Sequence, residues 1–250
     1  VPFTSPHAPI VPAPSHVGSS EAGPYGDFVA QTDATVGAVL QALEDAGLAD
    51  DTLVVFTSDN GPEHYAYERM RKFDHNSSGG LRGLKRDVWE GGHRVPMIVR
   101  WPDVVEANQT SDALVGQVDL MATMASLVGF ELPQDQAEDS FNLMPLWLDE
   151  VDRVRDFLVH NTSAKKWGIR RGKWLLIDHQ DGTHTRVPKW LRERYPANDQ
   201  GVMLCDLEKD LEQKINLAGQ HPDVVVELRV LLTDVRERGH SAPRLAPETN

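Results

Sequence analysis

The sequence predicts an α/β protein with a largely parallel central sheet, because helical and apolar strand-like segments alternate along its first part. Residues 26–47 carry apolar side chains at three- and four-residue spacing, which is typical of a helix that ends at Gly47. The apolar, β-rich run of residues 52–58 follows. Its continuous apolar core, Leu53 to Phe56, indicates a strand buried on both faces of a parallel sheet.

Three further elements complete this first part. A long polar loop is expected over residues 61–92, and its length indicates a function beyond connection. The apolar residues 97–101 predict a second buried strand. Residues 119–129 begin with an N-cap-like aspartate and end in glycine, so they predict a helix.

The pattern changes to short strands after about residue 150. Strands are expected at residues 155–160, 167–170, 173–178 and 202–206. A helix is expected over residues 222–238, where four apolar residues share one face: Val225, Leu228, Leu232 and Val235. This change predicts two units, residues 1–150 and residues 151–250.

Two oxygen-bearing side chains, Asp59 and Asn60, stand where the strand of residues 52–58 ends. Ligands of open α/β sheets gather just beyond the carboxyl ends of the strands. A carboxylate beside an amide oxygen suits a hard cation such as Ca²⁺ or Mg²⁺ better than zinc. The same residues are equally typical of an Asx turn followed by Gly61.

Composition and charge limit the classes of partner. The 250 residues carry a formal net charge of −13, which argues against nucleic acid as a partner. No apolar run approaches the ~20 residues that a membrane span needs. Residues 71–100 nevertheless hold seven cations and three anions, so an anionic group would be drawn to this part of an acidic chain.

Several short segments, taken together and in order, resemble the sulfatase family. The pattern covers nearly the whole chain. Its parts are Ser5-Pro6-His7-Ala8-Pro9, Gly23-Pro24-Tyr25-Gly26-Asp27, Asp59-Asn60-Gly61, the run from Gly83 through Lys85 and Trp89-Glu90-Gly91-Gly92 to Pro96, Leu204-Cys205-Asp206-Leu207 and Asn216-Leu217-Ala218.

The resemblance implies an alkaline phosphatase-like sandwich that ends in a small antiparallel sheet with one helix. It also implies roles for individual residues. Asp59 and Asn60 match calcium ligands, Lys85 matches the lysine that holds the sulfate, and His7 matches the histidine that faces the bridging oxygen of the ester. His64 and His160 are further candidates for contact with the substrate. The resemblance also implies a periplasmic or secreted location.

One motif of the family has no match in this chain. Sulfatases carry a Cys/Ser-x-Pro-x-Arg motif whose first residue is oxidised to formylglycine, the nucleophile. Cys205 is followed by Asp206-Leu207, and in Ser241-Ala-Pro-Arg244 the arginine comes one residue early. The chain therefore resembles the carboxyl-terminal half of a sulfatase. We expect it to need the amino-terminal half of the same enzyme as a partner, and to be inactive alone.

Two other classes stay open. The first is a metal-dependent phosphodiesterase or phosphonate hydrolase of the same broad group, in which two transition metals are expected instead of one calcium. The second is a noncatalytic module that binds sulfated glycans. The sequence does not specify whether an aryl sulfate or a carbohydrate sulfate is the substrate.

Overall fold

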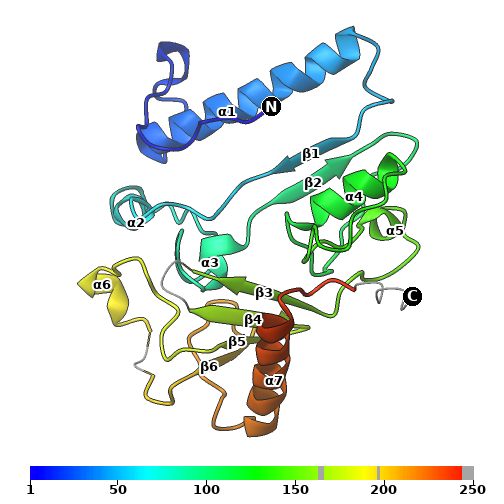
Figure 1. Ribbon diagram of the computed structural model, residues 1–250. Coiled ribbons are helices and arrows are strands. Elements are labelled where there is room, and N and C mark those ends of the chain that lie inside the picture. Colours follow the sequence, from blue (N-terminus) through cyan, green and yellow to red (C-terminus); the bar gives the residue numbers. More distant parts are fainter. Residues whose placement is uncertain (163–165, 196–197, 244–250) are drawn as a thin grey trace, which may run out of the picture.

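The computed structural model describes residues 1–162, 166–195 and 198–243. Its elements are η1 (Pro14–His16), α1 (Gly23–Asp45), β1 (Val54–Thr57), α2 (Ala66–Phe73), α3 (Glu90–His93), β2 (Met97–Arg100), α4 (Asp119–Leu127), α5 (Met144–Trp147), β3 (Phe157–Asn161), β4 (Trp167–Arg171), β5 (Trp174–Ile177), α6 (Lys189–Arg192), β6 (Met203–Asp206) and α7 (Pro222–Arg238). Figure 1 shows α1 at one end of the molecule, the β1–β2 pair in the middle, and the other four strands with α7 at the opposite end. The mixed α/β class is confirmed.

The long helices lie where the sequence predicts them. Helix α1 begins three residues before the expected start, and Gly47, just past its end, has a φ of +67°. Helix α7 has the predicted bounds and buries the four predicted residues of its apolar face. Asp119 is not an N-cap, because it is the first helical residue of α4 and its carboxylate accepts hydrogen bonds from the backbone of Gly116 and Phe141.

The expected parallel pairing is wrong for the two strands of the first part. Strand β1 pairs antiparallel with β2, with Phe56 opposite Ile98 and Thr57 opposite Met97. These strands are also not buried on both faces, since Phe56 is 38% exposed and Ile98 is 59% exposed. A short apolar run fixes neither the direction of its partner strand nor its burial. One consequence is that the end of β1 lies beside the start of β2.

The predicted C-terminal antiparallel sheet is confirmed, with the strand order β3-β4-β5-β6. Successive side chains of a strand point to opposite faces, so each strand can build two cores. Ile169, Leu176 and Leu204 pack with the buried face of α7 on one side of the sheet. Helix α7 thereby covers that face (Figure 1).

The opposite face of this sheet is covered by a segment from far upstream, residues 82–92, which we call the lysine segment. Val88 and Trp89, 0% and 1% exposed, form a second core with residues from β5 and β6. The members of that core from the sheet and the turn after it are Leu175, Ile177, Met203, Cys205 and Leu207. The expected division at residue 150 stays a prediction, but the lysine segment shares its core with the part after that boundary.

The loop expected over residues 61–92 contains two helices, α2 and α3. Helix α2 is short and mostly polar, and it is held by Arg69, whose guanidinium lies 3.7 Å from the ring centroid of Tyr25.

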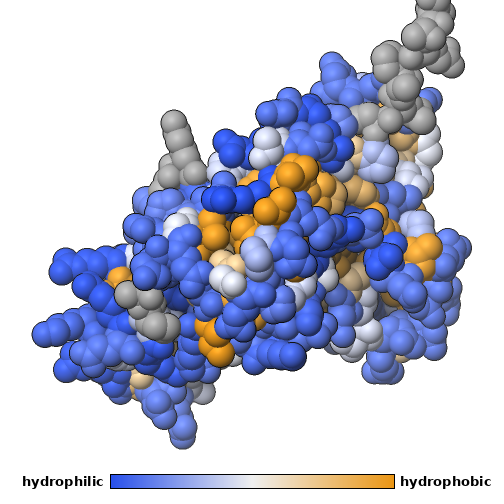
Figure 2. All heavy atoms as spheres, turned by 90° about the horizontal axis from the view of Figure 1, so that it is seen from below, coloured by the Kyte–Doolittle hydropathy of each residue, from blue (hydrophilic) through white to orange (hydrophobic). Residues whose placement is uncertain are grey.

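Across the described ranges, no helix is both long and apolar enough to cross a membrane. Figure 2 shows one face of the molecule, on which a central group of hydrophobic residues is surrounded by hydrophilic ones.

Candidate active site

The predicted metal ligands lie on the loop that follows β1, residues 58–63, which we call the Asp-Asn loop. Asp59 is exposed, and its carboxylate makes no hydrogen bond or ion pair with any described residue. The side-chain amide of Asn60 donates from Nδ2 to the carbonyl of Gly61 over 2.9 Å, which leaves its Oδ1 available. Two oxygens of this kind fit a calcium ion, which takes six to eight oxygen ligands in all. Two side chains can supply only part of such a set.

The backbone of the Asp-Asn loop is joined to the lysine segment at two points. The amide of Gly61 donates to the carbonyl of Gly92 over 3.0 Å, and the amide of Lys85 donates to the carbonyl of Pro62 over 2.9 Å. A Cβ atom on Gly61 would lie 1.9 Å from the carbonyl oxygen of Gly91, so only glycine allows this approach. The structure therefore brings the two predicted metal ligands and Lys85 into adjoining segments.

An ion pair adds a third connection. Arg86 donates from Nη1 and Nη2 to the two carboxylate oxygens of Glu63, and both distances are 2.7 Å. The hydrogen bonds from Arg86 hold the pKa of Glu63 well below its usual range. This pair could not be predicted from the sequence, because its members lie 23 positions apart and no sequence pattern indicates that their segments are in contact.

The ammonium group of Lys85 is unpaired within the described residues. The other cations between residues 82 and 100 each have a partner. Arg82 stacks between Trp89 and Tyr195 and donates to the carbonyl of Gln213, while Arg86, Arg94 and Arg100 pair with Glu63, Glu90 and Glu44. Between residues 82 and 100, Lys85 is therefore the cation that lacks a described partner, and it is half-buried next to the Asp-Asn loop.

The other side of the lysine segment is held by the C-terminal part of the chain. Asp87, 3% exposed, accepts hydrogen bonds from the backbone amides of Leu84, His184 and Thr185. Burial raises the pKa of Asp87, although these three donors oppose the effect. The hydroxyl of Thr185 donates to the carbonyl of Lys85. Sequence analysis identified neither Asp87 nor Thr185, and the position of a carboxylate directly before the apolar Val88 is the one signal that could have indicated Asp87.

Glu90, at the start of α3, is fixed in the same way. It is 1% exposed, its amide donates to Oε1 of Gln213, and its carboxylate pairs with Arg94 and Arg170. Arg94 is thus occupied by a buried carboxylate. The Glu-Gly-Gly turn is therefore tied to the four-stranded sheet.

His160, a predicted substrate contact, lies at the junction of the two parts. Its Nε2 and the Nε2 of His93 both donate to the carbonyl of Val88, over 3.0 and 3.1 Å, and the two rings lie 3.8 Å apart. Burial lowers the pKa of His160 to about 3 and that of His93 to about 4, so both rings are neutral at pH 7. Nδ1 of His160 is buried without a hydrogen-bond partner.

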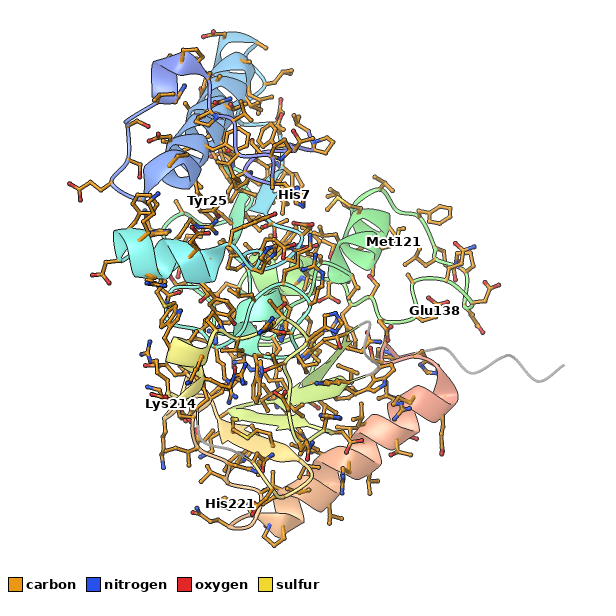
Figure 3. The ribbon with its side chains drawn as sticks, turned by 90° about the vertical axis from the view of Figure 1, so that its left-hand side faces the viewer. His7, Tyr25, Met121, Glu138, Lys214 and His221 are labelled. Atoms are coloured by element: carbon orange, nitrogen blue, oxygen red, sulfur yellow. The ribbon has the colours of Figure 1, made fainter. Side chains whose placement is uncertain are left out.

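The two remaining predicted histidines are exposed. His64 follows the Asp-Asn loop, and its Nδ1 lies 3.0 Å from Oε1 of Glu63. His7 makes one side-chain hydrogen bond, from its Nδ1 to the carbonyl of Ala8. Figure 3 places His7 in the upper part of the molecule near α1, away from the four-stranded sheet. Within the described residues no hydrogen bond links His7 to the Asp-Asn loop or to Lys85.

Three further observations concern possible nucleophiles and metal ligands. Cys205 is fully buried, and burial raises the pKa of its thiol to about 12, so it is not a nucleophile at neutral pH. The fourth residue of the near-match at Ser241, Arg244, lies outside the described residues. Among the residues that the structure describes, no cluster of three or more His, Cys, Asp or Glu side chains could hold a metal by itself.

Two family models match this chain. The sulfatase model matches residues 2–130, and the model of the C-terminal part of N-sulphoglucosamine sulphohydrolase matches residues 83–237. The two matches overlap over residues 83–130, a range that begins within the lysine segment.

Similar proteins carry the same family assignment. The chain is 36% identical to N-acetylgalactosamine-6-O-sulfatase of Bacteroides thetaiotaomicron, with 93% of this chain and 45% of the relative covered. It is 33% identical to human arylsulfatase A, with 90% and 46% covered. A solved chain from a study of glycosaminoglycan metabolism by Bacteroides thetaiotaomicron aligns with a TM-score of 0.81 and 34% identity, over 94% of this chain and 49% of that chain. This chain spans about half the length of these relatives, and it belongs to the sulfatase family.

Proposed function

We propose that the protein to which this chain belongs is a sulfuric ester hydrolase that acts on an aryl or carbohydrate sulfate. One observation supports this most: Lys85 has no ion-pair partner among the described residues, and its backbone is bonded to the loop that carries Asp59 and Asn60. An anionic group placed at this junction would meet the ammonium on one side and a cation site on the other. The hydrolysis of a sulfate ester builds negative charge, which fixed cations stabilise.

In this proposal Lys85 binds one oxygen of the sulfate as a compact point charge. The neighbouring Arg86, Arg94 and Arg82 are occupied by other partners, so they leave this task to Lys85. The positions of these arginines also explain why the charge excess of the sequence does not by itself identify the binding residue.

Asp59 and Asn60 would hold a calcium ion through a carboxylate oxygen and an amide oxygen. When bound, calcium would neutralise charge on the sulfate and orient the nucleophile. The remaining ligands would come from parts of the protein outside this chain. The isolated chain should therefore bind calcium weakly.

His7 would donate a proton to the leaving alcohol or phenol, a role for which the pKa of histidine is suited. Contact of His64 and His160 with the substrate remains a prediction. For His160 such contact would have to use Nδ1, because Nε2 is bonded to Val88.

The nucleophile would be a formylglycine in the part of the protein outside this chain, whose location we propose to be periplasmic or secreted. The chain alone should not hydrolyse sulfate esters, because positioning and charge without a nucleophile leave only weak catalysis. The names of the relatives include both aryl and carbohydrate sulfatases, so the proposal covers both substrate classes.

The test compares variants of the full protein on 4-nitrophenyl sulfate and on N-acetylgalactosamine 6-sulfate. Lys85→Ala should lower kcat by a factor of about 100 or more, since a charge aimed at the transition state is lost. Lys209→Ala, which removes an exposed lysine beyond β6, is the control and should keep full activity. Near-normal turnover of Lys85→Ala would contradict the assignment.

Metal analysis of the same protein separates the alternatives. One calcium per chain supports a sulfatase, whereas two zinc or manganese ions with activity on phosphodiesters would replace this proposal by the phosphodiesterase class. Binding of sulfated glycans without turnover would identify a noncatalytic module.

A further inference from the structure

Lys85 lies at the second position of a tight turn formed by residues 84–87. The amide of Asp87 donates to the carbonyl of Leu84 over 2.9 Å, which closes the turn. Arg86, the third residue, has a φ of +77°, a conformation that residues with a side chain rarely adopt. Such a turn persists only when its surroundings hold it. The side chains of Asp87 and Thr185 hold the turn of residues 84–87.

The carboxylate of Asp87 links the turn to the C-terminal part, because its two oxygens bind on different sides. Oδ2 accepts from the amide of Leu84 over 2.9 Å, inside the turn. Oδ1 accepts from the amides of His184 and Thr185, over 2.6 and 2.8 Å, outside it. The carboxylate is thus occupied by backbone donors and does not pair with the ammonium of Lys85.

Thr185 adds a direct bond to the lysine backbone. Its hydroxyl donates to the carbonyl of Lys85 over 2.8 Å, while the amide of Lys85 donates to Pro62 over 2.9 Å. Both polar backbone groups of Lys85 are therefore bonded, one to each flanking segment. Thr185 is 8% exposed, so water competes little for its hydroxyl.

We propose that Asp87 and Thr185 are positioning residues, which hold the backbone of Lys85 from the C-terminal part so that its side chain starts from a fixed point beside the Asp-Asn loop. The proposal rests on the proposed function, in which Lys85 binds the sulfate. A charged side chain stabilises a transition state most when it already lies in the required position and does not have to move as the transition state forms. Fixing the backbone of a flexible lysine from both sides reduces that reorganisation.

Substitutions of Thr185 in the full protein test the catalytic part of this inference. Thr185→Val removes the hydroxyl with little change in volume and should lower kcat about tenfold with a smaller change in KM. Thr185→Ser keeps the hydroxyl and should retain most of the activity. Melting temperatures of both variants show whether the fold is kept.

A double-mutant cycle with Lys85→Ala separates positioning from general structural damage. Thr185→Val should have almost no further effect on kcat when Lys85 is already alanine. An equal loss in both backgrounds would overturn the inference, because Thr185 would then act independently of Lys85.

Hydrogen exchange gives a readout that does not depend on sulfatase activity. In Asp87→Asn the side chain has one acceptor oxygen and an amide group, so it cannot accept from all three backbone donors. The amides of Leu84, Lys85, His184 and Thr185 should then exchange faster. The control is Asp206→Asn, since Asp206 is also buried and accepts from the amide of Glu208, but at the end of β6.

The two readouts separate failure of the inference from failure of the proposed function. Unchanged exchange at Lys85 in both Asp87→Asn and Thr185→Val would overturn the positioning role. Faster exchange together with full activity of Lys85→Ala would instead refute the role of Lys85 in sulfate hydrolysis, and the positioning of its backbone would stand.

Discussion

Glu63 and Arg86 form a bidentate ion pair, with both oxygen–nitrogen distances at 2.7 Å. The pair joins the loop that carries the predicted calcium ligands to the residue that follows Lys85. Two parts of the proposed active site therefore share a connection that involves neither metal nor substrate.

Replacing Glu63 by glutamine should loosen this connection. We expect a loss of about 0.5–1 kcal/mol in the free energy of unfolding, a small value because the side chain of Arg86 is 43% exposed. The loss should shrink at high salt, which screens the pair. Urea unfolding at low and high salt measures it, and Glu44→Gln, which breaks the remote pair with Arg100, is the matched control.

The effect of Glu63→Gln on turnover should exceed that of Glu44→Gln and fall short of that of Lys85→Ala. Equal activity of the two glutamine variants would show that the ion pair does not help to align the site.

Gly61→Ala should be strongly destabilising. Its new Cβ would lie 1.9 Å from the carbonyl oxygen of Gly91, and backbone on both sides would have to move. We expect a loss of more than about 2 kcal/mol in urea unfolding. The control is Gly37→Ala in α1, where a Cβ meets nothing within 4 Å and should stabilise the helix by about 0.5–1 kcal/mol. A Gly61→Ala protein as stable as the wild type would mean that the two segments do not approach this closely.

Stability should fall below pH 6.5 because of His93 and His160. Their pKa values in the folded protein, about 4 and about 3, lie below that of an unfolded histidine. Between pH 6.5 and 4 the unfolded chain therefore binds protons that the folded chain does not, and the folded state loses up to about 1.4 kcal/mol per histidine and pH unit. Above pH 6.5 both histidines are neutral in the folded and in the unfolded chain, so this loss of stability is absent there.

The measurement is the free energy of unfolding as a function of pH. His160→Gln keeps a donor for the carbonyl of Val88 but cannot be protonated, so its curve should be flatter in this range. His16→Gln, in η1, is the control and should leave the slope unchanged. A wild-type curve without this slope would disprove the burial of the two rings.

Calcium binding should depend on Asp59. In the full protein, Asp59→Ala should weaken calcium affinity by a factor of ten or more, since a charged ligand is lost, and turnover should fall unless calcium is raised. Asp51→Ala removes another exposed carboxylate near β1 and should leave affinity unchanged. Isothermal titration calorimetry measures both, and tight stoichiometric binding by the 250-residue chain alone would contradict a site that is completed from outside it.

The sequence identified the elements whose signals are local. Helix α7 has an apolar face at regular spacing, Pro222 in its first turn and Gly239 just past its end, and its predicted bounds agree with the structure. Helix α2 was missed because its few residues are mostly polar and it is fixed by contacts with α1. The antiparallel pairing of β1 was missed because the direction of a partner strand leaves no trace in a four-residue run.

The candidate site shows the same limit. Asp59, Asn60 and Lys85 were identified from motifs, and the structure adds the bond between Lys85 and Pro62 that brings them together. Thr185 could not be found in this way, since it lies 100 positions from the carbonyl that it binds. Contacts over such a separation are set by packing of the whole chain.

The place of Val88 and Trp89 inside the second core has a consequence for the way this protein tolerates mutation. The four-stranded sheet cannot exclude water from one of its faces until these two side chains have docked, and docking them also places Lys85. Folding of the sheet and assembly of the site are then one cooperative event. Substitutions at Leu175 or Ile177, far from any reacting group, should therefore reduce the amount of competent enzyme rather than the rate of each competent molecule.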